Sequence, residues 1–457
     1  MTRVSRIALI VGLSTLSLAP VRAQDFDAAT YRARRDRLSA AAREGVVIVQ
    51  GVTQDQPGLT EYLIDDSDDH DFLYLTGVET KTATLVLLPQ STTYPEILFV
   101  PDDETAHAQA TSGVKTVMPI GKLSDVLSEA LTDYSMKRLT ERRHKLVSTE
   151  IARVLSLTPR KVFYVNYPRY VNLAAEPPAR VALGERLRLF SSAVELRDDT
   201  PFLTRLRMRH DQTELAMITK AVHMGALGLM AAMKASKPGA FDYQVDAVAE
   251  ATFKHEGASR IAYPPLTYIS PFGRPVQALS ASQLGKSSEP QSAIHQMQSG
   301  DLVMLDAGGE YHHYASDLSR MVPVSGKFTP EQRQLYDAVV AAHHAAIAAI
   351  RPGATFQQVH DAAVAELRKK NLDGMFTFGT SHFIGMDAHD PGDYEKPLEA
   401  GMILTVEPGF IDNQRNITVH VEDMVLVTDD GHQVLSDAVP IEAADVERML
   451  AAKPDAQ

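Results

Sequence analysis

Cysteine and tryptophan are both absent from the 457 residues of this chain. Without cysteine no disulfide can stabilise the fold, and no thiolate can act as a nucleophile. Hydrophobic residues make up 44% of the chain and charged residues 23%, which is typical of a globular protein rather than a disordered or fibrous one. The length predicts two domains, or three, each large enough for its own core.

Positive charge is also in deficit. Lysine and arginine number 45 against 58 aspartates and glutamates, so the formal net charge is −13. An acidic surface argues against nucleic acid or anionic lipid as a partner. We therefore expect the chain to bind no nucleic acid and, once its N-terminal segment is removed, no membrane.

The N-terminal segment has the pattern of an export signal. Two arginines precede an apolar run over residues 7–18, and a small-residue cleavage pattern ends at Ala23. We predict a signal peptide over residues 1–23, with Gln24 as the first mature residue, and a periplasmic or secreted protein. An uncleaved anchor is the alternative, but about 12 apolar residues fall short of the roughly 20 that span a bilayer.

Helical and strand patterns alternate after this segment. They predict an α/β domain with a mixed sheet over residues 24–205, in which DFLYLTG at 71–77 has the pattern of a strand. Polar composition and Pro201 mark the boundary near residue 205. A second domain is predicted over residues 206–450.

The second domain is predicted to begin with two long helices. Apolar residues recur at helical spacing over 211–233 and again over 243–256. Residues 264–293 are rich in proline, serine and glycine, which predicts a long loop. Apart from the N-terminus, no segment is expected to reach the length of a membrane span.

Five side chains in the last third of the chain carry the predicted chemistry. Each is a carboxylate or imidazole that follows or interrupts an apolar run or lies near a glycine: Asp306, Asp317, His382, Glu407 and Glu422. Any one of the acids alone is better explained by a turn or a cap. Together they form an oxygen-rich set that suits two divalent cations, because four negative charges offset two dications. The sequence therefore predicts a metal site.

Two further histidines belong to this region. Strand alternation places Thr418, His420 and Glu422 on one face, so His420 is expected beside Glu422. His389, seven residues after His382, is a candidate acid or base because the pKa of histidine lies near neutrality. No intact serine-hydrolase elbow, zincin helix or phosphate loop competes with this interpretation.

At these positions the sequence resembles the proline-specific metallopeptidases of the pita-bread fold, close to aminopeptidase P and prolidase. The resemblance is carried by GDLVMLDAGGEYHHYASDLSR, GTSHFIGMDAHD, LTVEPG and VEDMVLVT, and upstream by YRARRDRL and DDHDFLYLTGVE. It covers nearly the whole mature chain. It implies an α/β (α+β) protein with an N-terminal mixed-sheet domain and a C-terminal pita-bread catalytic domain.

The resemblance also implies an activity. An aminopeptidase or dipeptidase of this kind cuts Xaa-Pro bonds of small peptides with a hydroxide that bridges two divalent ions, usually Mn²⁺, or else Co²⁺ or Zn²⁺. By position, Asp306 would bind one metal, Asp317 and Glu422 would bridge the pair, and His382 and Glu407 would complete the ligand shell of the second metal. A homo-oligomer is expected.

Some neighbours depart from the family pattern. Phe378 stands where the family has histidine before Gly-Thr-Ser-His, His420 stands where it has arginine, and Glu289 stands where it has histidine. We place Phe378 and Glu289 in substrate binding. His389 matches the family histidine that steadies the substrate carbonyl or the tetrahedral intermediate.

His420 is placed with His389 among the catalytic groups and is expected to keep part of a positive charge. A different hydrolase or lyase on the same metals, a non-peptidase relative, and an interaction protein without metal stay open as alternatives.

Overall fold

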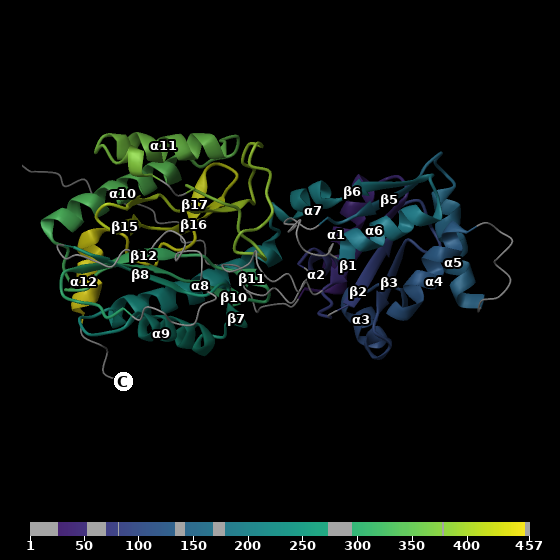
Figure 1. Ribbon diagram of the computed structural model, residues 1–457, viewed down its shortest axis with the longest axis horizontal. Coiled ribbons are helices and arrows are strands. Elements are labelled where there is room, and N and C mark those ends of the chain that lie inside the picture. Colours follow the sequence, from purple (N-terminus) through teal and green to yellow (C-terminus); the bar gives the residue numbers. More distant parts are fainter. Residues whose placement is uncertain are drawn as a thin grey trace, which may run out of the picture.

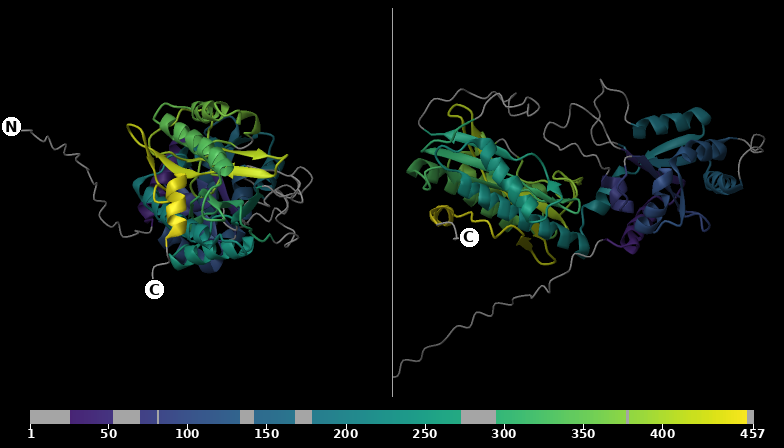
Figure 2. Two further views of the ribbon diagram at one scale, coloured as in Figure 1. Left: turned by 90° about the vertical axis from the view of Figure 1, so that its left-hand side faces the viewer. Right: turned by 90° about the horizontal axis from the view of Figure 1, so that it is seen from below.

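The computed structural model describes residues 26–52, 70–80, 82–132, 142–167, 179–272, 295–376 and 379–452. They form two bodies side by side along the long axis of the molecule, the N-terminal body at the right of Figure 1 and the C-terminal body at the left. Figure 2 shows the same arrangement from one end and from below. The predicted signal peptide, Glu289 and Phe378 lie outside the described residues.

The N-terminal body is built on a mixed sheet of six strands in the order β4-β3-β2-β1-β5-β6. The strands are β1 (Val46–Val52), β2 (Thr82–Leu87), β3 (Glu96–Val100), β4 (Thr116–Pro119), β5 (Lys161–Val165) and β6 (Val194–Asp198). Strand β1 pairs antiparallel with β2 and parallel with β5, which confirms the predicted mixed sheet. Its unbroken apolar run is buried on both faces, as expected of a central strand.

Helices cover both faces of this sheet. One face carries α1 (Ala28–Ala41), α2 (His70–Thr76) and α3 (Thr105–Ser112). The other carries α4 (Leu123–Leu131), α5 (Arg142–Leu155) and α6 (Ala179–Phe190). The N-terminal body is therefore a three-layer α/β domain.

The prediction of a strand over 71–77 is wrong, because this segment forms the helix α2. All seven residues of α2 are buried, so apolar side chains face every direction and leave no helical stripe in the sequence. The helix ends at Gly77, whose φ is 67°. Only glycine fits there, since an added Cβ would lie 2.2 Å from the ring of Tyr31.

The C-terminal body contains short antiparallel sheets. Its strands are β7 (Arg260–Ile261), β8 (Leu266–Pro271), β9 (Asp301–Asp306), β10 (Gly309–Tyr311), β11 (Tyr314–Ala315), β12 (Ser319–Pro323), β13 (Ile403–Val406), β14 (Gly409–Asp412), β15 (Ile417–His420), β16 (Asp423–Val427) and β17 (His432–Val434). Strand β9 lies between β8 and β12, β16 lies between β13 and β17, and β14 pairs with β15. An isolated bridge between Ser319 and Glu422 joins two of these sheets.

Two helix pairs enclose these strands. In Figure 1, α8 (Gln212–Ala235) and α9 (Asp242–His255) lie below β8 and β12, and α10 (Pro330–Ala349) and α11 (Phe356–Arg368) lie above β15 and β16. The short helix α12 (Ala443–Ala451) ends the described chain. Helices α8 and α9 are the two that the sequence predicts. The predicted loop over 264–293 is wrong in part, since its first residues form β8 and the remainder from residue 273 lies outside the described ranges.

Helix α8 is long and apolar enough to cross a membrane, the one such helix in the described part of the chain. It has 24 residues, and 56% of its most apolar window is buried inside the protein. The expectation that no segment after the N-terminus reaches this length is therefore wrong. A helix packed in a core, here against α9 and β10, needs apolar residues on most of its surface.

Helix α7 (Thr200–Arg207) connects the two bodies. Pro201 lies in its first turn, where the missing N–H has no partner within the helix in any case. The predicted boundary at residue 205 falls inside this helix, and the division there stays a prediction.

Candidate metal centre

Asp306 and Asp317 are brought together because the chain between β9 and β12 turns out and back through the short hairpin of β10 and β11. Asp306 is the last residue of β9, and β12 runs back antiparallel beside it with Ser319 opposite Asp306. The turn needs Gly308, because an added Cβ there would lie 1.7 Å from the carbonyl oxygen of Ser316. The second carboxylate thus returns next to the first, as the spacing in the sequence predicts.

His382, Glu407 and Glu422 arrive from adjoining segments. The hydroxyl of Thr405 accepts the backbone N–H of His382 at 3.1 Å and donates to the carboxylate of Glu407 at 3.3 Å. The backbone N–H of Glu422 donates to the carbonyl of Ser319 at 3.0 Å, which ties it to β12. All five candidate ligands therefore converge on one place.

The imidazole of His382 lies among three of these carboxylates. Its Nε2 is 3.4 Å from Glu407, 3.7 Å from Asp317 and 3.9 Å from Glu422. Its Nδ1 lies 3.0 Å from the carbonyl of Phe383, which can only accept, so Nδ1 carries the hydrogen. Burial lowers the pKa of His382 to about 3. At pH 7 the neutral ring therefore presents a lone pair to the acids, an arrangement that a cation would stabilise.

The phenol of Tyr263 fixes the first two acids. Its hydroxyl lies 2.6 Å from Asp306 and 2.5 Å from Asp317, and the ring is buried. Burial, and then the charges of the neighbouring carboxylates, raise the pKa of Tyr263 well above its ordinary value. The hydroxyl thus stays protonated and can donate its one hydrogen to either carboxylate, with both within hydrogen-bond distance.

The carboxylates of the cluster repel one another in a site with little water. Burial raises the pKa of Asp306 to about 6. Burial and the neighbouring acids raise the pKa of Asp317, Glu407 and Glu422 well above the ordinary range. One oxygen of Glu422 is buried with no hydrogen-bond partner among the described residues. Burial of several acids in this way is costly unless a positive charge lies between them.

A divalent metal would stabilise the clustered carboxylates and accept the lone pair of His382. The ligand atoms of His382, Glu407 and Glu422 lie within 4.8 Å of one another, and so do those of Asp306, Glu422 and His420. Carboxylate oxygens and neutral imidazole nitrogens are the donors that Mn²⁺, Co²⁺ and Zn²⁺ accept in proteins. The residues present therefore fit a divalent metal centre.

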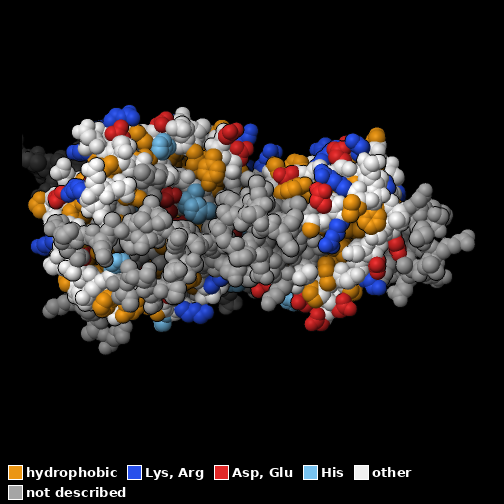
Figure 3. All heavy atoms as spheres, viewed as in Figure 1, with side chains coloured by type: hydrophobic (Ala, Val, Ile, Leu, Met, Phe, Trp, Pro, Cys, Tyr) orange, Lys and Arg blue, Asp and Glu red, His pale blue; other side chains and the backbone are white. Residues whose placement is uncertain are grey.

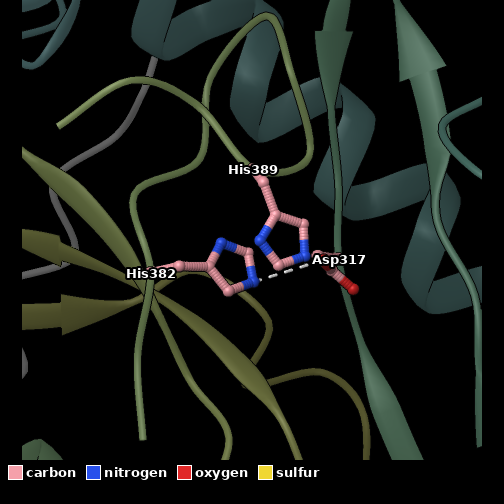
Figure 4. A group of neighbouring side chains, drawn as sticks. All are labelled: Asp317, His382 and His389. Carbon is pink, nitrogen blue, oxygen red and sulfur yellow. Dashed lines mark ion pairs between the residues drawn. The ribbon is translucent and has the colours of Figure 1, made fainter. Parts of the chain in front are cut away.

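His389 lies against the ring of His382, as Figure 4 shows. The two ring centroids are 3.9 Å apart with 16° between the planes. A ligand atom of His389 also lies within 4.8 Å of those of Asp317 and His382. Unlike His382, His389 is exposed to solvent. It can therefore meet a molecule that enters the centre from outside.

The face drawn in Figure 3 has acidic and histidine side chains close together on the C-terminal body. Acidic side chains are visible deep beside a histidine in the C-terminal body, next to a broad area outside the described residues. Acid and imidazole groups therefore reach solvent together on this face.

His420 lies inside the centre rather than at its surface. Its side chain is 2% exposed. Burial, and then the nearby His343, lower the pKa of His420 to about 3. The expectation that His420 keeps part of a positive charge is therefore wrong, because a buried imidazole loses the hydration that stabilises its charged form. Its predicted catalytic role stays a prediction.

Two groups of the centre were missed from the sequence. Tyr263 gave no signal, because a single tyrosine before two prolines has no distinguishing pattern. Thr405 could have been found, since it stands two residues before Glu407 and strand alternation places both on one face. The substrate-binding roles of Phe378 and Glu289 stay predictions outside the described residues.

The structure thus places a carboxylate and imidazole cluster that fits divalent metal in the second of two α/β domains. Residues 216–429 match the metallopeptidase family M24, and residues 31–139 match the N-terminal domain of aminopeptidase P. Residues 216–429 therefore form a domain of metallopeptidase family M24. Membership of this family implies divalent metal at the centre.

Individual relatives agree with this assignment. The chain is 30% identical over 287 residues to a Xaa-Pro aminopeptidase of Haemophilus influenzae, a match that covers 56% of this chain and 64% of that protein. It is 28% identical over 419 residues to the mitochondrial intermediate cleaving peptidase 55 of Arabidopsis thaliana, covering 84% and 74% of the two chains. The solved structure of proline aminopeptidase P II from Yersinia pestis is similar, with a TM-score of 0.72 and 26% identity over 93% of this chain and 100% of that one.

Proposed function

We propose that this protein is a Xaa-Pro aminopeptidase that works with two divalent ions, Mn²⁺ first among them. The observation that carries the proposal is the position of the buried His382, whose Nε2 lies within 3.9 Å of the carboxylates of Asp317, Glu407 and Glu422. The names of relatives such as the Haemophilus influenzae enzyme support the substrate class.

The ions would be held by the cluster that the sequence predicts: Asp306, Asp317, His382, Glu407 and Glu422. Divalent ions there would polarise the scissile carbonyl and lower the pKa of water. Tyr263 and Thr405 orient the carboxylates through their hydroxyls. His389, exposed beside His382, would donate to the substrate carbonyl and to the oxyanion that develops from it.

A peptide assay tests this function. Purified protein with added Mn²⁺ should release the first residue from Xaa-Pro tripeptides and leave matched Xaa-Ala tripeptides nearly uncut. His389→Ala should lower kcat by about 10²–10³, the usual cost of losing one transition-state donor, with the metal content unchanged. Intact Xaa-Pro peptides at full metal loading would overturn the proposal.

We propose in addition that the protein is exported and homo-oligomeric. The N-terminal pattern over residues 1–23 supports export, and the match of residues 31–139 to the N-terminal domain of aminopeptidase P, whose family often forms dimers or tetramers, supports the oligomer. Mass spectrometry of the protein from its native compartment should find Gln24 as the first residue, and light scattering should give a multiple of the chain mass. A retained signal or a monomer would count against the respective proposal.

The alternative of another reaction on the same metals gains no support from the matched relatives, whose names specify peptidases. Phe378 and His420 are still the positions to test it. If the variant with Phe378→His and His420→Arg cuts Xaa-Pro peptides while the natural chain does not, the natural chain has another role.

A further inference from the structure

His420 is the one group of the centre whose burial and position disagree with the role expected from the sequence. It ends strand β15, two residues before Glu422, and pairs with Gly409 across the sheet. One of its ring nitrogens lies within 4.8 Å of ligand atoms of both Asp306 and Glu422. Each donor lies about 2.1 Å from a bound ion, so two ligands of one ion are at most about 4.2 Å apart. A small movement of these three side chains would therefore bring them around a cation.

We propose that His420 is a sixth metal-binding side chain, which ligates through a ring nitrogen the ion held by Asp306 and Glu422. This inference rests on the metal centre of the proposed function but not on the peptidase reaction. The sequence resemblance implies arginine at this position. Arginine carries a permanent charge and has no lone pair, so it cannot ligate a metal, whereas a neutral imidazole can.

The surroundings of His420 suit a ligand. The ring is 2% exposed and has room only because residue 409 is glycine, where an added Cβ would lie 2.8 Å from Nδ1 of His420. A buried ring of this kind has little access to substrate but direct access to the two carboxylates.

A second imidazole changes the expected metal preference. With His420 the donor set contains two nitrogens, His382 on one side and His420 on the other, together with four carboxylates. Imidazole favours Zn²⁺ and Co²⁺, whereas carboxylate and carbonyl oxygens favour Mn²⁺. We therefore expect this chain to bind Zn²⁺ and Co²⁺ more tightly, relative to Mn²⁺, than its His420→Gln variant, whose amide would offer an oxygen instead.

Calorimetric titration of metal-free protein tests the preference. His420→Gln should lower the affinity for Zn²⁺ and Co²⁺ by about 10–100-fold and the affinity for Mn²⁺ by less. The matched control is His343→Gln. His343 is also buried, but its ring lies 3.1 Å from Asp423, the residue that pairs with Arg320 and is not among the candidate metal ligands. Its replacement should therefore leave the ratio of metal affinities unchanged.

Cadmium NMR on protein with isotope-labelled histidine tests ligation directly and needs no activity. Cadmium–nitrogen coupling should appear on two histidines in the natural chain and on one in either His420→Gln or His382→Gln. Coupling on His382 alone in the natural chain would overturn the inference and leave the proposed function intact. A natural chain that binds no divalent ion would overturn both, and circular dichroism of each variant separates these outcomes from misfolding.

Discussion

Glu422 and Asp423 are neighbours in the chain, but the protein gives them opposite environments. Glu422 faces the other acids of the centre, where burial and their charges raise its pKa well above the ordinary range. Burial alone would raise the pKa of Asp423 as well, but Arg320, His343 and Ser436 outweigh it and bring the pKa to about 2. Of these two neighbours, Glu422 would be stabilised by a bound cation, whereas Asp423 is already paired with the cation of Arg320.

The ion pair of Asp423 with Arg320 should be a main support of this strand. The guanidinium lies 2.7 Å from the carboxylate, and both side chains are buried. Asp423→Ala leaves the charge of Arg320 buried without its partner, so we expect the free energy of unfolding to fall by about 3–5 kcal/mol. Denaturant unfolding of metal-free protein at pH 7 measures it.

The control for this prediction is Asp337→Ala, which breaks an exposed pair with Arg333 of nearly equal length, 2.8 Å. Exposed pairs contribute about 0–1 kcal/mol. Equal losses in the two variants would show that burial of the Asp423 pair does not matter.

The candidate ligands could be predicted from sequence for a local reason. Asp306 and Glu407 each follow an apolar strand, and a carboxylate in that position is costly without a partner. The phenol that holds Asp306 could not be predicted in this way. Tyr263 lies 43 residues earlier in the chain, and only the fold brings it to the centre.

At the scale of elements, one guanidinium organises the loop that carries His389. Arg207, at the end of α7, donates to Asp387 at 2.9 Å and to Asp390 at 2.5 Å, the residues that flank the 388–389 pair. It also donates to Asp71 of α2 at 2.7 Å. The loop is therefore tied to the helix that joins the two bodies and to the N-terminal body.

Loss of this guanidinium should loosen the loop. Arg207→Gln removes the cation that Asp71, Asp387 and Asp390 share, although His70 still contacts Asp387 at 2.5 Å. We therefore expect hydrogen exchange over residues 384–391 to become faster and kcat to fall. Arg209→Gln is the matched control. Arg209 lies two residues after Arg207 and makes an exposed ion pair with Glu399 at 3.2 Å. Exchange that stays slow in Arg207→Gln would contradict the prediction.

The limits of the sequence at this scale come from burial. Helix α2 is buried on all sides, so its apolar run has no period that distinguishes helix from strand. The run over 417–425 has strand alternation throughout, but the chain changes partner within it: β15 pairs with β14, and β16 pairs with β13 and β17. Pairing partners depend on contacts between distant segments, which alternation does not encode. The prediction that His420 lies beside Glu422 is still confirmed, because ligand atoms of both residues lie within 4.8 Å of each other in the centre.

At the scale of the whole molecule, the acids of the centre should make stability depend on metal and pH together. The pKa values of Asp317, Glu407 and Glu422 are raised in the folded protein relative to the unfolded chain. A raised carboxyl pKa contributes stability at low pH that is lost as the pH rises through the folded value. The buried rings of His382 and His420 act in the opposite direction, with folded pKa values of about 3, but only below the unfolded value of about 6.5.

Above pH 6.5 the two histidines no longer change the stability with pH, so of these groups only the carboxyls do. Between pH 6.5 and 8.5, metal-free protein should lose about 1.4 kcal/mol of stability per pH unit for each of these carboxyl protons that the folded protein keeps and the unfolded chain has already released. Divalent metal neutralises the same charges, so the rise in melting temperature on adding Mn²⁺ should be larger at pH 8.5 than at pH 6.5. Scanning calorimetry with chelator and with metal at both values measures the difference. Glu422→Gln removes one titrating acid and should flatten the pH dependence of the metal-free protein, whereas an equal metal effect at both pH values would show that the acids are not held together as the structure places them.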